Sequence, residues 1–377
     1  MADVLSAMGH SKRTSRTICI GECIEMMKLV KKAMAAFLAA LMMLGATSCS
    51  SGDNSWAVKY GDKTVPIGVY IYCLFTAYNS ALTQVEDSSQ DVLSQQVEGV
   101  NAEQWIRDNA MEQLKTMLLI EDKMAEMNLT LTEDEQSQAD QVINSMWSQY
   151  SSQLEAYGIS QSSFEYALTQ MTGNYTKVFS AYYGADGPSP VSDDELKSYF
   201  EENYTDFQYL LNAYQNNEAD EDGSYAMTEE QKTETKAEMD ELAEKITAGE
   251  MTVEEAETAY EESVGENAAM PLSADTVILS SSTYPEEFIN LLNEMSPGEA
   301  RTIEVALSTQ PVYTLVIKND ITKKTESQFS TESGKLSVLS SMKSEEFQSL
   351  LQEEANALTG VEVNQSAIDG QKLSKFA

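Results

Sequence analysis

The stretch from residue 284 to residue 318 reads YPEEFINLLNEMSPGEARTIEVALSTQPVYTLVIK, and it sets the expectation for the fold. Proline is favoured in the first turn of a helix, which predicts a helix that starts near Pro285 and ends before Ser296-Pro-Gly. Two segments rich in β-branched residues follow, Arg301–Leu307 and Val312–Lys318. The Ser-Thr-Gln-Pro sequence between them predicts a hairpin. The stretch therefore predicts a helix and two antiparallel strands.

The residues before this stretch complete a small domain. Phe207–Tyr214 has the composition of a strand, and Thr276–Leu279 leaves room for another. Between them, Thr228 and Thr252 are each followed three residues later by Gln or Glu. This is the spacing of a capping box, and it predicts two helices. The order of these elements predicts an α+β fold, for which we expect a four-stranded antiparallel sheet.

The first part of the chain has a helical pattern after one short extended segment. Trp56–Val65 predicts a strand with a Gly-Asp turn. Three helices are then expected: one that opens at Asn101, one from Thr132 to about Tyr157, and one from about Gln161 to Tyr183. A further helical pattern begins near Gln328. Both ends of the chain are therefore expected to be mainly helical.

The domain boundaries follow from composition. The clearest linker is Ala185-Asp-Gly-Pro-Ser-Pro190, and a short helix is expected after it. We assign residues 55–203 to a mostly helical domain and residues 205–320 to the α+β domain. Residues 328–377 are expected to form a C-terminal helical segment that packs on the first domain.

The composition excludes several classes of function. The chain has 24 Lys and Arg against 61 Asp and Glu, a formal net charge of -37, so nucleic acid is not an expected partner. The one histidine, His10, lies in the leader segment described next. Without histidine the exported chain cannot build a Ser-His-Asp or Cys-His nucleophile or a His-ligated zinc site. We therefore expect no cofactor and no metal.

Residues 27–49 have the pattern of an export signal. A basic start is followed by an apolar run that is too short to span a membrane, and small residues then precede Cys49. The ending Leu-Gly-Ala-Thr-Ser-Cys resembles a bacterial lipobox, which implies that the Cys49 thiol takes a diacylglycerol and that cleavage makes Cys49 the N-terminus. We expect translation to start at Met26 or Met27, residues 1–48 to form the leader, and residues 49–54 to form a lipidated tether. An ordinary cleaved signal is the alternative.

Residues 205–320 resemble a parvulin-type prolyl isomerase domain. The resemblance rests on Tyr284-Pro-Glu-Glu-Phe288, then Met-Ser-Pro-Gly-Glu and Arg-Thr-Ile-Glu-Val, in the order that parvulins have. The paired helices expected over residues 236–260 also resemble the family's helices joined at a Gly-Asp-Phe turn. The helical flanks resemble the chaperone lobe of PrsA-like and SurA-like foldases, which is assembled from both chain ends.

The resemblance implies where a proline pocket would lie. The family has a histidine on its first strand and another on its last, and these positions correspond here to Tyr209 and Thr314. Tyr284 and Phe288 would line the same pocket. Isomerisation needs no nucleophile, because it lowers a barrier of roughly 18–20 kcal/mol by destabilising the planar amide in a shaped apolar site. We expect that the loss of both histidines leaves the domain inactive.

One acidic loop has oxygen ligands at the spacing of an EF-hand. The candidate calcium ligands are Glu218, Asp220, Asp222 and Glu229. The EF-hand pattern has aspartate where Glu218 stands, and a strand rather than a helix is expected before the loop. A solvated acidic loop is the favoured alternative.

Taken together, these patterns predict a lipid-anchored protein on the extracytoplasmic face of the cell membrane. We expect it to act as a foldase or chaperone that binds unfolded exported polypeptides, with an inactive parvulin-like domain. Two alternatives stay open: an active peptidyl-prolyl cis-trans isomerase, and a structural or scaffold lipoprotein that does not bind unfolded chains.

Overall fold

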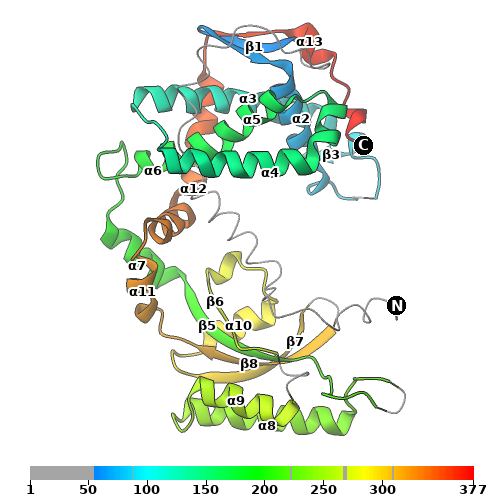
Figure 1. Ribbon diagram of the computed structural model, residues 1–377, viewed down its shortest axis with the longest axis vertical. Coiled ribbons are helices and arrows are strands. Elements are labelled where there is room, and N and C mark those ends of the chain that lie inside the picture. The colour runs from blue at the N-terminus through cyan, green and yellow to red at the C-terminus, as the bar shows by residue number, and fades with distance from the viewer. Residues whose placement is uncertain (1–54, 88, 221–222, 266–269, 308–309) are drawn as a thin grey trace. The chain divides into compact units, whose positions relative to one another are not determined.

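The computed structural model describes residues 55–377 except 88, 221–222, 266–269 and 308–309, and the chain divides into two compact units (Figure 1). Unit 1 contains the described residues up to Pro190 together with Lys343–Ala377, and unit 2 contains Val191–Met342. The units thus divide at residues 190 and 342, whereas the sequence patterns place the domain boundaries at residues 203 and 320.

The reason lies in two short helices, α7 (Asp193–Asn203) and α11 (Thr322–Gln328). The Thr325 hydroxyl donates a hydrogen bond to Glu201 at 2.6 Å, and the rings of Phe200 and Phe329 lie 6.0 Å apart. These contacts hold α7 and the chain beyond residue 320 together within unit 2.

Unit 1 begins with a strand, a turn and a second strand. β1 (Trp56–Tyr60) pairs antiparallel with β2 (Lys63–Pro66), and Gly61 takes a positive φ of 59° in the turn between them. On its other side β1 pairs with β9 (Val361–Val363), so the sheet order is β2-β1-β9. The last strand of the chain thus completes the sheet that the first described residues begin.

The rest of unit 1 is mainly helical. Its longer elements are α2 (Ile67–Leu82), α3 (Ala102–Glu126), α4 (Glu133–Tyr157), α5 (Gln161–Leu168), α6 (Tyr175–Tyr182) and the second half of α12 (Glu332–Ala357). Its shorter elements are η2 (Val92–Ser94), β3 (Gln96–Val97), β4 (Val100–Asn101), η3 (Thr169–Asn174), α13 (Gln365–Asp369) and η5 (Leu373–Lys375).

The helix ends follow the capping signals of the sequence. Thr132 and Glu135 form a capping box at the start of α4, and Gly158 ends that helix in a left-handed conformation. The side chain of Asn101 caps α3. The third expected helix is interrupted, because the π-helical segment η3 separates α5 from α6. The core beneath these helices is centred on α2, which buries Tyr70, Cys73 and Leu74.

Unit 2 contains an antiparallel sheet of four strands in the order β6-β5-β8-β7. The strands are β6 (Ser273–Val277), β5 (Thr205–Asn212), β8 (Gln310–Lys318) and β7 (Ala300–Leu307). The helices of this unit, besides α7, α11 and the first half of α12, are α8 (Glu229–Thr247), α9 (Val253–Val264), η4 (Leu279–Ser281) and α10 (Glu286–Glu294). The predicted α+β class and four-stranded sheet are confirmed.

The sheet of unit 2 is covered on both faces. Figure 1 shows α8 and α9 on one side and α10 on the other. One core lies between the sheet and α8–α9 and includes Leu210, Met239 and Leu315. A separate core lies between the sheet and α10 and includes Phe207, Phe288 and Val316. Side chains alternate between the faces of a strand, so successive residues of β5 and β8 contribute to different cores.

Candidate functional site

The candidate site is the sheet face of unit 2 that carries α10, here called the α10 face. On β5, the alternating residues Phe207, Tyr209 and Leu211 point to this face. Tyr209 lies opposite Val316 of β8, and Leu211 lies opposite Thr314. Phe288 comes from α10 itself, and Tyr284 comes from the turn just before that helix. The α10 face thus gathers side chains from three segments that are distant in sequence.

Four aromatic rings form one cluster on the α10 face. Tyr284 and Phe288 are stacked, with centroids 4.9 Å apart and an interplanar angle of 19°. Phe207 packs edge-on against both rings, at 5.4 Å from Tyr284 and 5.6 Å from Phe288. Tyr209 meets the same two rings at 6.4 and 6.3 Å. Each such pair adds roughly 0.5–1.5 kcal/mol beyond the area it buries, so the cluster holds its members in fixed positions.

The cluster has a buried base and a partly exposed surface. Phe207 and Phe288 are buried, whereas Tyr209 and Tyr284 are only partly buried. Partly buried apolar side chains surround them: Leu211, Val277, Ile289, Leu291 and Ile303. The result is an apolar and aromatic surface with two phenol groups in it, which suits contact with apolar side chains and with a proline ring.

The Tyr284 hydroxyl is fixed by polar neighbours. It donates a hydrogen bond to Asp275 of β6 at 2.9 Å. The pKa of Tyr284 is raised well above its ordinary value. Burial is the largest cause, and a hydrogen bond with Tyr209 and the nearby charge of Asp275 add to it. Tyr284 therefore stays protonated at physiological pH and serves as a hydrogen-bond donor rather than a base.

Thr314 lies on the same face but has a different setting. It sits in the middle of β8, between Leu211 of β5 and Ile303 of β7, and its exposed fraction is 0%. Among the described residues its hydroxyl oxygen has no hydrogen-bond partner. A buried hydroxyl without a partner destabilises a protein by about 1–3 kcal/mol, so this position is energetically unfavourable in the free chain.

The structure places the four sequence-predicted pocket residues on one face. Tyr209, Tyr284 and Phe288 share the ring cluster, and Thr314 is two residues along β8 from Val316, the partner of Tyr209. Sequence reasoning missed Phe207 and Leu211 as members of this site. Their signal was present, since residues 207, 209 and 211 alternate along one strand and must share a face.

The predicted calcium ligands do not gather into a metal site in the part of the chain that is described. Asp220 accepts a hydrogen bond from the Ser224 amide at 2.8 Å and so closes a turn. Glu229 forms an ion pair with Lys232 at 2.7 Å. Asp222 lies outside the described residues, and a strand precedes the loop. Within the described ranges no group of three or more His, Cys, Asp or Glu side chains could hold a metal ion.

Two further features bear on the predicted membrane anchor. Cys49 and the whole leader lie outside the described residues. Within the described part of the chain, no helix has both the length and the apolar character that crossing a membrane requires.

Comparisons with known proteins give a weak result. No protein-family model and no curated protein matches the chain. Among solved structures, it is similar to the foldase protein PrsA from Streptococcus pneumoniae, with 15% identity and a TM-score of 0.37 over 76% of this chain and 98% of that chain. It is also similar to PrsA from Bacillus subtilis, with 15% identity and a TM-score of 0.24 over 75% of this chain and 88% of that chain. Because both TM-scores are below 0.5, conclusions about function depend on the residues of this chain.

Proposed function

We propose that the protein is a lipid-anchored extracytoplasmic chaperone that binds unfolded exported polypeptides through the α10 face. The observation that carries the proposal is the ring cluster: two partly exposed tyrosines stand on two buried phenylalanines and are surrounded by partly buried aliphatic side chains. Folded client proteins bury their apolar side chains, whereas unfolded ones expose them. A fixed apolar surface therefore discriminates in favour of unfolded chains.

The remaining features of the chain are compatible with this role. Its net charge of -37 keeps it soluble and repels anionic lipid surfaces, which suits a body tethered near a membrane. The predicted lipid on Cys49 would keep it where exported chains emerge. Binding of an unfolded chain is non-covalent and needs no nucleophile. The ring cluster, which contains no histidine or cysteine, is compatible with this.

The direct test is suppression of aggregation of a denatured model protein by the purified full chain. Tyr284→Ala removes a ring from the surface, and we expect it to raise the concentration needed for suppression by about tenfold, as loss of an aromatic anchor does at other interfaces. Tyr284→Phe is the matched control, because it keeps the stacked ring and removes only the hydroxyl. The proposal fails if Tyr284→Ala suppresses aggregation as well as the unchanged protein does.

A second candidate function is prolyl isomerisation, and the buried Thr314 hydroxyl is the observation that favours it. A buried polar group without a hydrogen-bond partner is a common cost of an active site, and this one lies on the same sheet face as the ring cluster. We still infer that the domain is inactive, because neither histidine of the parvulin pattern is present. The expected result with a proline-containing peptide is therefore no acceleration over the uncatalysed rate.

Thr314→Val separates these two roles. The two side chains have the same shape, so removal of the unsatisfied hydroxyl is expected to stabilise unit 2 by about 1–2 kcal/mol. Urea unfolding measures this, and Thr314→Ser, which keeps the hydroxyl, should show no such gain. If isomerisation is detected after all and Thr314→Val abolishes it, the hydroxyl is functional and the isomerase is the correct assignment. A loss of stability in Thr314→Val would mean that the hydroxyl has a partner.

A further inference from the structure

The outer edge of the unit 2 sheet has backbone groups without strand partners. Among the described residues, β7 pairs only with β8. The Thr247 hydroxyl accepts a hydrogen bond from the Ala300 amide at 2.8 Å and donates one to the Ala300 carbonyl at 3.1 Å. The backbone of Ala300 therefore points away from β8. Because this direction alternates along a strand, the N–H and C=O groups of Thr302, Glu304 and Ala306 also point outward.

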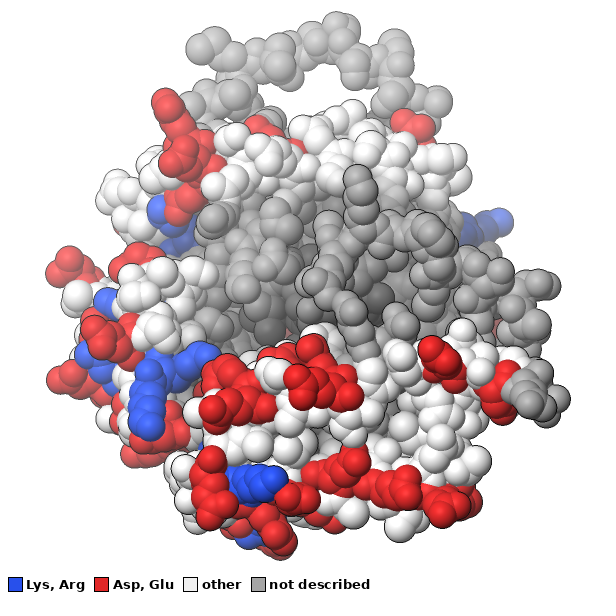
Figure 2. Space-filling view, turned by 60° about the horizontal axis from the view of Figure 1, so that its bottom comes forward, with Lys and Arg blue, Asp and Glu red and all other residues white. Residues whose placement is uncertain are grey.

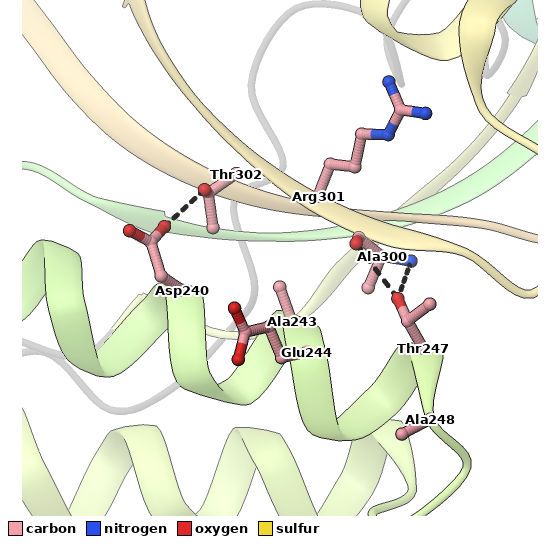
Figure 3. A pocket seen from close by; sticks show the side chains of 8 residues that line it. All are labelled: Asp240, Ala243, Glu244, Thr247, Ala248, Ala300, Arg301 and Thr302. Atoms are coloured by element: carbon pink, nitrogen blue, oxygen red, sulfur yellow. Dashed lines mark hydrogen bonds between the residues drawn. The ribbon is translucent and has the colours of Figure 1, made fainter.

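A depression lies beside this edge, between β7 and α8 (Figure 3). Its volume is about 610 Å³. Ala243, Ala248 and Ala300 line it with small apolar groups, and the carboxylates of Asp240 and Glu244 lie on its α8 side. A strand added to the edge of β7 would point every second side chain toward α8, over this depression. The alanines leave room for an aliphatic stem, and the two carboxylates favour a positive charge at its end.

The charges around the depression are mainly negative. Asp240 accepts hydrogen bonds from the hydroxyls of Thr302 and Tyr313, and both go to its Oδ1 atom. Arg301 points away from α8 in Figure 3 and is paired with Glu294 and Glu299. Figure 2 shows acidic side chains over much of the described surface on the side of α8 and α9.

The nearby lysines are already in ion pairs. Lys236, one turn before Asp240 on α8, is paired with Glu304, and Lys245 is paired with Glu241 at 2.6 Å. Glu244 has no partner of its own in the described part of the chain. Among the described residues that line the depression the one cation is Arg301, and it is paired with Glu294 and Glu299 rather than with Asp240 or Glu244.

We propose that the edge of β7 takes up an extended segment of a client polypeptide as an additional strand, with Lys or Arg at alternate positions over Asp240 and Glu244. This inference rests on the proposed chaperone function and adds the class of segment that is recognised. The outward N–H and C=O groups of β7 would bind the backbone of any sequence that has no proline where a backbone N–H must donate a hydrogen bond. The carboxylates of Asp240 and Glu244 would select basic side chains. It uses a different surface from the α10 face, so the two can be tested separately.

The test is binding of a fluorescent peptide that alternates valine with lysine, measured by anisotropy on the purified full chain. Ala306→Pro removes one outward N–H and places a ring at the edge, while the bonds to β8 stay intact. Ala306 is exposed and lies opposite Pro311, so proline fits there without loss of a ladder bond. We expect affinity to fall by about tenfold, the effect of one lost main-chain bond with its clash. Ala306→Val is the matched control and should bind normally.

A second variant tests the charge without risk to the fold. Glu244→Gln keeps the shape of the side chain and is expected to weaken the valine–lysine peptide severalfold, but not a peptide that alternates valine with glutamine. A peptide with the same lysines grouped at one end controls for general attraction to a chain of net charge -37. Equal affinity for the grouped and alternating peptides would overturn the proposal.

The possible failures can be told apart. If the chain suppresses aggregation but Ala306→Pro binds the peptide like the unchanged protein, the edge proposal is wrong and the chaperone function stands. If the chain neither suppresses aggregation nor binds the peptide, both are wrong. If Ala306→Pro instead abolishes a dimer seen by analytical ultracentrifugation, the edge is occupied by a second copy of the chain and not by a client.

Discussion

A chain that ends at Met342 is expected to lose the folded state of unit 1 while unit 2 stays folded. Unit 1 is built from both ends of the sequence, and this truncation removes its entire C-terminal part, Lys343–Ala377. Phe347 of α12 is 0% exposed and packs against Tyr175, Phe179, Tyr182 and Tyr183, with ring centroids 5.3 to 6.0 Å away. Replacement of one such buried ring by alanine lowers the free energy of unfolding by about 3–5 kcal/mol. The free energy of unfolding of a whole domain is usually only about 5–15 kcal/mol.

The last residues add further contacts that the truncation would remove. β9 pairs with β1, and without it β1 would have a free edge. The ring of Phe376 lies 5.0 Å from that of Tyr157, 5.8 Å from Tyr78 and 5.9 Å from Phe75. The Lys375 amine donates a hydrogen bond to the Tyr157 carbonyl at 2.8 Å, at the end of α4. The losses therefore come from several parts of the core and exceed what a marginally stable unit can tolerate.

Tryptophan fluorescence can follow the unfolding of unit 1 directly. The three tryptophans, Trp56, Trp105 and Trp147, all lie in unit 1, so their urea-induced transition reports on that unit alone. In the truncated chain this transition should disappear, while far-UV circular dichroism keeps the cooperative transition of unit 2. The point variant Phe347→Leu is the control and should only lower the midpoint. A normal tryptophan transition in the truncated chain would contradict the two-ended organisation of unit 1.

Local signals in the sequence predicted most of the elements, because capping and strand composition act over a few residues. Thr132, Ser192, Thr228 and Thr252 each open a helix with a reciprocal capping box, as their spacing to Glu or Gln predicts. The strand expected at Thr276–Leu279 forms slightly earlier, at Ser273–Val277, where it pairs with β5. Strand boundaries depend on the partner strand, which the local pattern does not contain.

The features that sequence reasoning missed depend on contacts between distant residues. β9 has three residues and contains a glutamate, and it becomes a strand because β1 offers an edge. The helix α7 follows the linker as expected, but its packing against α11 places it in unit 2. The four pocket residues came from a family resemblance, whereas the outward backbone groups of β7 became evident only with the strand register.

Replacement of Phe207 by alanine is expected to weaken both the fold of unit 2 and the proposed binding surface. Phe207 is 0% exposed and contacts all three other rings of the cluster. Its truncation should lower the free energy of unfolding of unit 2 by about 3–5 kcal/mol. Phe207→Leu fills more of the space and should lose less. Far-UV circular dichroism measures the loss, and the tryptophan transition should stay unchanged because the tryptophans are in unit 1.

The effect of Phe207→Ala on function distinguishes residues that support the binding surface from residues that contact the client. Tyr284 is partly exposed and would touch a client, whereas Phe207 is buried and can act only by holding Tyr284 and Phe288 in place. If the ring cluster binds clients, Phe207→Ala should impair suppression of aggregation even at temperatures where unit 2 remains folded, and Phe207→Leu should restore part of it. Normal suppression by folded Phe207→Ala would show that clients bind elsewhere. The edge of β7 would then be the surface to test, because Ala306 and Glu244, where its variants are made, do not belong to the ring cluster.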